Sequence, residues 1–313
     1  MTSSRMKRYQ HRTFGGPEVL ELVEEERPVP AEGEILLRVA AAGINPVDSL
    51  TRLGAAPLPG EPPYHPGWDS SGTVEATGPG VTRFRAGDEV FGMHPGGAHA
   101  QYLTAPADAF ARKPAGITHV EAAGVPVAAL TAWQALVALG GLRAGQRVLI
   151  HAAAGGVGHL AVQLAKARGA YVYGTARAAK HGFLRGLGVD EPIDHTRDDF
   201  VAVARDVDLA LDLIGGEYGP RTLATLRPGG LLVSAIVWNP GFEESVPKLT
   251  GVRFAPLLVA PDGEQLTGIA DLLADGRLQV HLDAVLPFGE AAKAATLLET
   301  KRTTGKIVLD VTA

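Results

Sequence analysis

Residues 147–158, RVLIHAAAGGVG, decide the fold of this chain. The first five, RVLIH, form a short apolar run of the kind found in buried strands, and a turn of small residues follows at once. The next stretch, HLAVQLAKARG, has the composition of a helix. A strand, a glycine turn and a helix in succession predict the first half of a βαβ unit.

The glycine turn follows the pattern G-x-G-x-x-G, with Ala153 in the first place and Gly155 and Gly158 in the second and third. Gly155 would let the backbone approach a pyrophosphate, and Gly158 would let helix and strand pack closely. The helix N-terminus favours the charge of a phosphate. An ordinary strand-to-helix turn is the alternative. A dinucleotide site is favoured because further strands are predicted at residues 171–176, 207–213 and 231–237.

The end of the second strand separates the two nicotinamide cofactors. Enzymes that use NAD place an Asp or Glu there for the ribose hydroxyls. Residues 170–189 contain no acid and carry the basic residues Arg177, Lys180, His181 and Arg185. We expect Arg177 and Lys180 to bind the 2′-phosphate of NADPH, and Arg185 to belong to a solvated helix start, which is also the alternative for the other two. NADPH is therefore the expected cofactor.

Composition excludes several classes of function. The chain has 313 residues, 46% of them hydrophobic, which suits two packed domains. Its formal charge is -5, with 29 basic and 34 acidic residues spread along the chain, so nucleic acid is not an expected partner. The chain has no cysteine, which excludes disulfides and any zinc site built on thiolates.

One stretch, residues 122–142, carries no charge and is long enough to cross a bilayer. Pro126, Thr131 and Gln134 interrupt it and alanine predominates, so we expect a buried helix of a globular protein. The N-terminus, MTSSRMKRYQHRTFGG, lacks the apolar core of a secretory signal. The sequence predicts no membrane partner and a cytoplasmic location.

The texture of the sequence changes twice. Residues 14–113 hold short β-type runs between Gly- and Pro-rich turns, among them 34–41 and 88–91. Residues 126–274 alternate strand and helix patterns, which predicts a doubly wound parallel sheet. The tail holds an apolar run at 284–287, a helix pattern at 289–299 and a strand pattern at 305–310, and its domain is open from pattern alone.

Several segments occur in an order known from one family: AAGINPVDSLTRLG, PYHPGWDSSGTVEATGPGV, GDEVFG, GGAHAQYLTAP, VPVAALTAWQAL, AAAGGVG, DLALDLIGG, RPGGLLVSAI and GKIVLDV. Together they resemble the quinone oxidoreductase, or zeta-crystallin-like, branch of the medium-chain dehydrogenases/reductases, over nearly the whole chain. The resemblance implies an α/β protein with two domains. A GroES-like β-rich catalytic domain would comprise residues 1–125 and 275–313, and a Rossmann NADP-binding domain with a doubly wound parallel sheet would comprise residues 126–274.

The resemblance also argues against zinc. Zinc alcohol dehydrogenases of this superfamily have an early Cys and a Gly-His-Glu stretch, whereas this chain has Asn45 and, at 67–69, Gly-Trp-Asp. Histidines outside any recognised ligand array are expected to be loop or packing residues: His65, His94 and His99. We therefore expect no catalytic metal.

Asn45 and Asp48 of the NPVD motif are the expected catalytic residues, because the resemblance places them beside nicotinamide and substrate. Asn45 would also contact the cofactor, although an Asn before a proline also suits a turn. Thr131 would contact the cofactor, with a bond to its own helix backbone as the alternative. Asp69 is expected to tie a loop together rather than to act in catalysis.

The remaining cofactor contacts that the resemblance implies lie in the glycine turn and after later strands: Ala154, Gly155, Gly156, Val157, Gly158, Thr175, Arg177, Lys180, His195, Ile214 and Ala235. His195 stands where the family often has Tyr or Phe, and it could reach the 2′-phosphate, more strongly when protonated.

The expected activity is hydride delivery from NADPH, without zinc, to an electron-poor small molecule, either a quinone or an α,β-unsaturated carbonyl. An enoyl-thioester reductase and a non-catalytic NADPH-binding protein are the alternatives. The proton donor is open between solvent and Tyr64, the nearest phenol to the NPVD motif. Family members are often homodimers, and the resemblance is compatible with a homodimer here.

Overall fold

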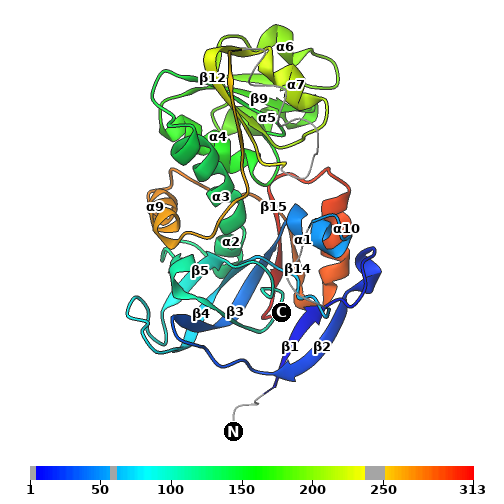
Figure 1. Ribbon diagram of the computed structural model, residues 1–313, viewed down its shortest axis with the longest axis vertical. Helices are drawn as coiled ribbons and strands as arrows, with labels where there is room; N and C mark the ends of the chain where they lie inside the picture. Colours follow the sequence, from blue (N-terminus) through cyan, green and yellow to red (C-terminus); the bar gives the residue numbers. More distant parts are fainter. Residues whose placement is uncertain (1–4, 57–61, 237–250) are drawn as a thin grey trace. The chain divides into compact units, whose positions relative to one another are not determined.

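The computed structural model describes residues 5–56, 62–236 and 251–313, and the chain divides into two compact units (Figure 1). Unit 1 comprises Met1–Val127, Pro261–Gly276 and Val280–Ala313, and unit 2 comprises Ala128–Ala260 and Arg277–Gln279. The predicted division assigns residues 261–274 to the nucleotide-binding domain, whereas in the structure they group with unit 1.

Unit 2 is built on a parallel sheet whose strand order, within the described residues, is β10-β9-β8-β11-β12-β13. The strands are β8 (Arg147–Ile150), β9 (Tyr171–Ala176), β10 (Glu191–Asp194), β11 (Val207–Asp212), β12 (Leu226–Ser234) and β13 (Arg253–Pro256). The order reverses between β8 and β11, and the carboxyl ends of these two strands form a topological switch point. This confirms the predicted doubly wound sheet. The predicted strand at 231–237 begins earlier, and its last residue lies outside the described residues.

The helical segments of unit 2 are α3 (Pro126–Trp133), which begins in unit 1, the π-helical η3 (Gln134–Leu139), α4 (Gly158–Ala167), the 3-10 turn η4 (Ala178–Lys180), α5 (His181–Gly186), α6 (Phe200–Val203) and α7 (Tyr218–Leu223). Apolar side chains from the strands, among them Leu149, Ile193 and Leu232, pack with Phe200 in the core.

The charge-free stretch 122–142 is not the single helix that the sequence predicts. The helix α2 (His119–Ala123) ends at the second residue of this stretch, and α3 begins only at Pro126. Proline lacks the N–H that a helix interior requires, which explains the break. In the part of the chain that the structure describes, no helix is long and apolar enough to span a membrane.

Unit 1 contains a mostly antiparallel sheet with the order β14-β15-β3-β4-β5-β7, in which β6 also pairs with β3. The strands are β3 (Glu34–Ile44), β4 (Asp69–Thr77), β5 (Glu89–Met93), β6 (Tyr102–Pro106), β7 (Phe110–Arg112), β14 (Leu282–Pro287) and β15 (Lys306–Asp310). The strand β15 lies between β14 and β3, so the tail of the chain completes the sheet begun by the N-terminal part.

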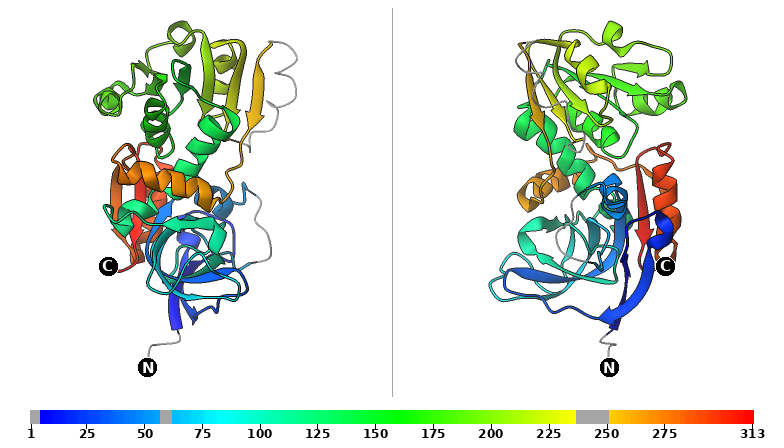
Figure 2. Two further views of the ribbon diagram at one scale, coloured as in Figure 1. Left: turned by 90° about the vertical axis from the view of Figure 1, so that its left-hand side faces the viewer. Right: turned by 45° about the vertical axis from the view of Figure 1, so that its right-hand side comes forward.

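Two further strands, β1 (Arg5–Gln10) and β2 (Glu21–Glu26), form an antiparallel hairpin that the sequence analysis did not predict. The helical segments of unit 1 are η1 (Pro17–Val19), α1 (Pro46–Arg52), η2 (Ala107–Ala109), α2, α9 (Gly263–Ala274), η5 (Phe288–Glu290) and α10 (Ala291–Glu299). The helix α10 packs along β15, the red strand of Figure 2.

The helix α9 groups with unit 1 because it packs directly on β7. A Cβ atom added to Gly263 would lie 2.4 Å from the carbonyl oxygens of both Asp108 and Phe110. Arg83 Nη2 donates to the Gly263 carbonyl over 2.9 Å and to Thr267 Oγ1 over 3.1 Å. The local pattern of residues cannot predict such contacts, since they join segments far apart in the chain.

Candidate functional site

The glycine turn leaves β8 at the switch point, and its two glycines serve different needs. A Cβ atom on Gly158, the first residue of α4, would lie 2.3 Å from the Ala152 carbonyl oxygen and 2.7 Å from Ala153 Cα. Close packing of strand and helix therefore requires glycine at 158. A Cβ atom on Gly155 would meet only the Ala152 carbonyl oxygen, at 3.2 Å. Packing within the described residues thus does not explain Gly155.

A directed chain of hydrogen bonds lies beneath this turn. Thr222 Oγ1 donates to the Tyr218 carbonyl over 2.6 Å and so accepts from His151 Nε2 over 2.8 Å. His151 Nδ1 is then left to accept from Thr175 Oγ1 over 3.3 Å. Thr175 Oγ1 in turn accepts the backbone N–H of Ala152 over 3.1 Å. The chain runs from the core of unit 2 to the first residue of the turn.

This chain requires a neutral His151. Burial, together with the smaller effect of the positive charges of Arg221 and His195, lowers the pKa of His151 to about 3. Ala152 has a φ of 47°, in the left-handed region that residues other than glycine rarely adopt. The bond from its N–H to Thr175 is one of the contacts that hold Ala152 in this conformation.

The predicted cofactor residues of unit 2 follow neighbouring parallel strands. Residues 154–158 follow β8. Thr175 is the second-last residue of β9, and Arg177 comes directly after that strand. His195, Ile214 and Ala235 come after β10, β11 and β12. The carboxyl ends of parallel strands share one edge of a sheet, so the structure brings these residues to that edge.

Their side chains differ in exposure. Arg177 and His195 are exposed, Ile214 is 40% exposed, and Lys180, at the end of η4, is half-buried. Thr175 is fully buried, and its hydroxyl is engaged with His151 and Ala152. Thr131 lies buried within α3.

Asp212, at the end of β11, organises the same edge and was missed by the sequence analysis. Its Oδ1 accepts the N–H groups of Ile214 and Gly215, each over 2.9 Å, and its Oδ2 accepts from Ser234 Oγ over 3.2 Å. An Asp that ends a predicted strand and precedes Ile-Gly-Gly is the signal that could have identified it.

A second polar group lies at one end of the sheet in unit 1. In the antiparallel pairs β15–β3 and β3–β4, the end of β3 lies beside the starts of β4 and β15. Ile44 ends β3, Asp69 begins β4 and Lys306 begins β15. Asn45 follows Ile44 directly and precedes α1, so the topology gathers residues from distant parts of the sequence.

These side chains form one buried network. Lys306 Nζ donates to Asn45 Oδ1, to the Ile44 carbonyl over 3.3 Å and to Asp69 Oδ2 over 3.3 Å. Asn45 Nδ2 donates to Asp69 Oδ2 over 2.9 Å, and the backbone N–H of Val127 donates to Asp69 Oδ1 over 2.7 Å. Asp69 ties segments together, as expected from the sequence, whereas Lys306 was missed.

Asp48 continues this network. Its Oδ2 accepts the backbone N–H of Asn45 over 2.8 Å, and its Oδ1 accepts that of Gly67 over 3.1 Å. Burial raises the pKa of Asp48, opposed by the positive charge of His99 and by the two N–H donors. His99 Nε2 bonds to the Gly43 carbonyl over 3.3 Å, and His99 Nδ1 is buried with no partner in the described part of the chain.

Tyr64, one candidate proton donor, is engaged in packing. It exchanges two backbone hydrogen bonds of 2.9 Å with His11. Its ring stacks on Phe14 at a centroid distance of 5.6 Å and lies 5.3 Å from the His11 ring.

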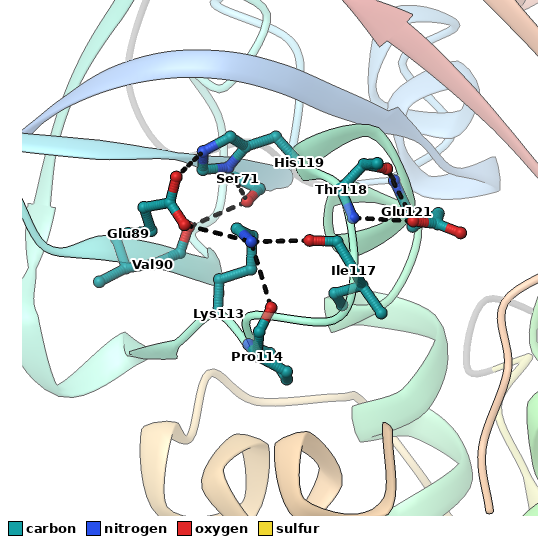
Figure 3. Close-up of polar contacts among 9 residues, drawn as sticks. All are labelled: Ser71, Glu89, Val90, Lys113, Pro114, Ile117, Thr118, His119 and Glu121. Carbon is teal, nitrogen blue, oxygen red and sulfur yellow. Dashed lines mark hydrogen bonds and ion pairs between the residues drawn. The ribbon is translucent and has the colours of Figure 1, made fainter. Parts of the chain in front are cut away.

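A third cluster has the connectivity of a hydrolytic triad (Figure 3). His119 Nδ1 lies 2.8 Å from Ser71 Oγ, and His119 Nε2 lies 3.2 Å from Glu89 Oε1. Lys113 Nζ forms an ion pair of 3.2 Å with Glu89 Oε2. Ser71 is fully buried and also bonds to the Val90 carbonyl. The Ser71 hydroxyl donates its proton to the Val90 carbonyl over 3.0 Å and not to His119, whereas a triad serine donates to its histidine. In the described structure this cluster ties α2 to the sheet.

Comparison with known proteins supplies the family. Residues 31–115 match the alcohol dehydrogenase GroES-like domain, and residues 187–309 match a domain described as zinc-binding dehydrogenase. The quinone oxidoreductase of Pseudomonas aeruginosa is 34% identical over 332 residues, which cover 97% of this chain and 99% of that protein. This chain belongs to the quinone oxidoreductase family. The predicted resemblance is confirmed, and the family is one of oxidoreductases.

Two other relatives extend the comparison. The structure of Escherichia coli quinone oxidoreductase complexed with NADPH is 30% identical, has a TM-score of 0.89 and covers 97% of this chain and 99% of that one. A mycocerosic acid synthase-like polyketide synthase of Mycobacterium tuberculosis is 34% identical over 323 residues. That match covers 97% of this chain but 15% of the synthase. Despite the zinc-binding name of one family domain, no group of three or more His, Cys, Asp or Glu residues that could hold a metal ion occurs among the described residues of this quinone oxidoreductase family member.

Proposed function

We propose that this protein transfers hydride from NADPH to a quinone or an α,β-unsaturated carbonyl without a catalytic metal. The observation that carries the proposal is the gathering of the glycine turn and the ends of β9 to β12 at one edge of a parallel sheet. NADPH supplies the hydride when bound. The protein's part is to hold the reactants in position and to polarise the acceptor oxygen.

The structure of the glycine turn fits a dinucleotide. The fold does not demand glycine at 155, and a missing side chain there suits close approach of a pyrophosphate to the backbone. The helix α4 has ten residues, and its N-terminus favours the phosphate charge.

The basic end of β9 supports NADPH over NADH. Arg177 is exposed directly after the strand, and Lys180 follows within one turn. No acid between residues 170 and 189 is available to bind ribose hydroxyls. The NADPH complex of the Escherichia coli relative agrees with this choice.

Unit 1 contributes Asn45 and Asp48 to the proposed reaction. Their network is buried and holds the NPVD segment rigid through Asp69 and Gly67. Protonation of the product by solvent is favoured over Tyr64, because the Tyr64 ring is stacked on Phe14.

The activity is tested by following NADPH oxidation with 1,4-benzoquinone, 9,10-phenanthrenequinone and a crotonyl thioester. Turnover with either quinone, at a kcat/KM above that for the thioester, is the expected result. An enoyl-thioester reductase is the second candidate, favoured by the likeness to part of a polyketide synthase, and a preference for the thioester would select it. Tight NADPH binding without any turnover would identify a non-catalytic binding protein. Because members of the family are often homodimers, we also propose a homodimer, and light scattering of the purified protein tests this.

A further inference from the structure

Lys306 is a buried charge for which the proposed reaction has so far given no role. Its side chain is 3% exposed, and burial of an ammonium group is costly unless it is paired and hydrogen-bonded. Its three N–H bonds are matched by three acceptors: Asn45 Oδ1, the Ile44 carbonyl and Asp69 Oδ2. The bond to Asn45 therefore satisfies the third N–H of the ammonium group and at the same time constrains the Asn45 carboxamide.

The ion pair fixes which way the Asn45 carboxamide faces. An ammonium group can only donate and a carboxylate can only accept. The Asn45 oxygen must therefore face Lys306, and its nitrogen must face Asp69. The flipped amide would place oxygen against the carboxylate and N–H bonds against the ammonium, which electrostatics forbids.

This orientation makes Asn45 a donor toward any further partner. Its oxygen is engaged with Lys306, and within the described chain Nδ2 donates to one atom, Asp69 Oδ2, which leaves the second N–H. Asn45 is 2% exposed, and a buried N–H without an acceptor destabilises the folded protein. The positive charge at the amide oxygen also polarises the N–H bonds and strengthens them as donors.

We propose that Lys306 is a positioning residue, which together with Asp69 orients and polarises the Asn45 carboxamide so that its second N–H donates to the carbonyl oxygen of the acceptor. This inference rests on the proposed function, since the oxygen in question is that of the quinone or enone. In this reaction the C–H bond at nicotinamide C4 of NADPH would break, leaving NADP+, and a new C–H bond would form at the β-carbon of the enone or quinone. The C=C electron pair would shift so that the carbonyl oxygen becomes negative and later takes a proton from solvent, and a quinone adduct would then tautomerise to the hydroquinone. The Asn45 N–H stabilises that developing charge.

The test compares two neutral double variants. In Lys306→Met with Asp69→Asn, both charges of the pair are removed with little change of shape, so no unpaired charge is left buried. The matched control, Lys113→Met with Glu89→Gln, removes another ion pair of unit 1 (Figure 3). The side chain of its lysine is 5% exposed. We expect kcat with 1,4-benzoquinone to fall roughly 10- to 100-fold in the first variant and less than about 3-fold in the control. The dissociation constant for NADPH should stay within about twofold in both.

A double-mutant cycle separates positioning from mere structural support. Asn45→Ala should lower kcat by roughly 100-fold or more in the wild-type background. In the Lys306→Met, Asp69→Asn background the same change should cost less than about 5-fold, because residues that act as a unit are not additive. If circular dichroism shows that the double variant does not fold, Lys306→Gln replaces it in the same cycle. We expect kcat to fall less in this variant than in the double variant, and Asn45→Ala to cost less in it than in the wild type.

The outcomes distinguish the two proposals. Wild-type turnover, with an Asn45→Ala effect of equal size in both backgrounds, would overturn the role of Lys306 and leave the proposed function standing. Wild-type protein that binds NADPH but reduces no acceptor would overturn the proposed function, and the role of Lys306 with it. A reduced effect of Asn45→Ala in the variant background, with unchanged NADPH affinity, supports the role.

Discussion

Two hydrogen-bonded networks of this protein, a neutral centre in unit 2 and a charged centre in unit 1, hold their residues in place by opposite means. In unit 2, the chain from Thr222 through His151 and Thr175 to Ala152 consists of neutral groups only. In unit 1, the buried ammonium group of Lys306 and the buried carboxylate of Asp69 each hydrogen-bond to the carboxamide of Asn45. A neutral frame suits a ligand that brings its own phosphate charges, whereas a fixed charge suits an atom that becomes charged only during reaction. If the proposed function holds, unit 2 would receive the charge of the cofactor phosphates, and unit 1 would apply charge to the acceptor.

The largest expected effect comes from the glycine turn of the neutral centre. Gly158→Val places side-chain atoms within 2.3 Å of the Ala152 carbonyl and should prevent unit 2 from folding. In Gly155→Val the added Cβ atom would approach a single atom, the Ala152 carbonyl oxygen, at 3.2 Å. The protein should therefore fold, while its NADPH affinity is lost. Circular dichroism and fluorescence titration measure the two properties. Unchanged NADPH affinity in folded Gly155→Val would contradict a dinucleotide site at this turn.

The second-largest expected effect concerns the basic residues of unit 2 that we propose bind the 2′-phosphate of NADPH. Arg177→Ala with Lys180→Ala should weaken NADPH binding roughly 10- to 100-fold, since a charge-assisted hydrogen bond is worth about 1.5 to 3 kcal/mol. NADH lacks the 2′-phosphate and should be nearly unaffected, and added salt should weaken NADPH more than NADH. Calorimetry with both nucleotides measures this. Arg185→Ala, in the last turn of α5, is the matched control and should change neither affinity. A double variant that keeps the wild-type preference would rule out these two residues.

The neutral centre could be predicted in part from the sequence because it is local. β8, the turn and α4 are contiguous, and β9, β11 and β12 could be assigned from pattern, whereas β10 was not predicted as a strand. The hydrogen-bond chain could not, because an apolar run such as RVLIH does not reveal whether its histidine faces solvent, nucleotide or core. Its partner Thr222 lies 71 residues away.

Most of the charged centre could not be predicted from the sequence. Lys306 and Asn45 are separated by 261 residues, and only the pairing of β15 with β3 brings them together. In the sequence, GKIVLD shows a strand whose lysine has the pattern of a solvated end. Residues of the NPVD segment were predicted from the family resemblance and not from spacing, and the grouping of α9 with β7 likewise depends on contacts between distant segments.

His151 provides a test of neutrality by pH. The unfolded chain binds a proton at His151 near pH 6.5, whereas the folded protein keeps it neutral down to about pH 3. The stabilisation is therefore present above pH 6.5 and is lost as the pH falls toward 3, about 2 kcal/mol of it between roughly pH 8 and pH 5. In His151→Gln, which keeps an N–H donor for Thr222, the unfolding free energy should fall less over that range. Urea titrations of both proteins measure the difference, and equal slopes would mean that His151 is charged in the folded state.

The smallest expected effect is that of metal removal, and it concerns the charged centre. We expect kcat with 1,4-benzoquinone to be unchanged after dialysis against a chelator and after addition of zinc. The chain has no cysteine, so a thiolate site is excluded. Asn45 Oδ1 and Asp69 Oδ2 both bond to the ammonium group of Lys306, and its positive charge repels a second cation at these oxygens. A metal-dependent enzyme would lose activity with the chelator and regain it with zinc, and that result would mean that the charge applied to the acceptor comes from a metal ion and not from Lys306 through Asn45.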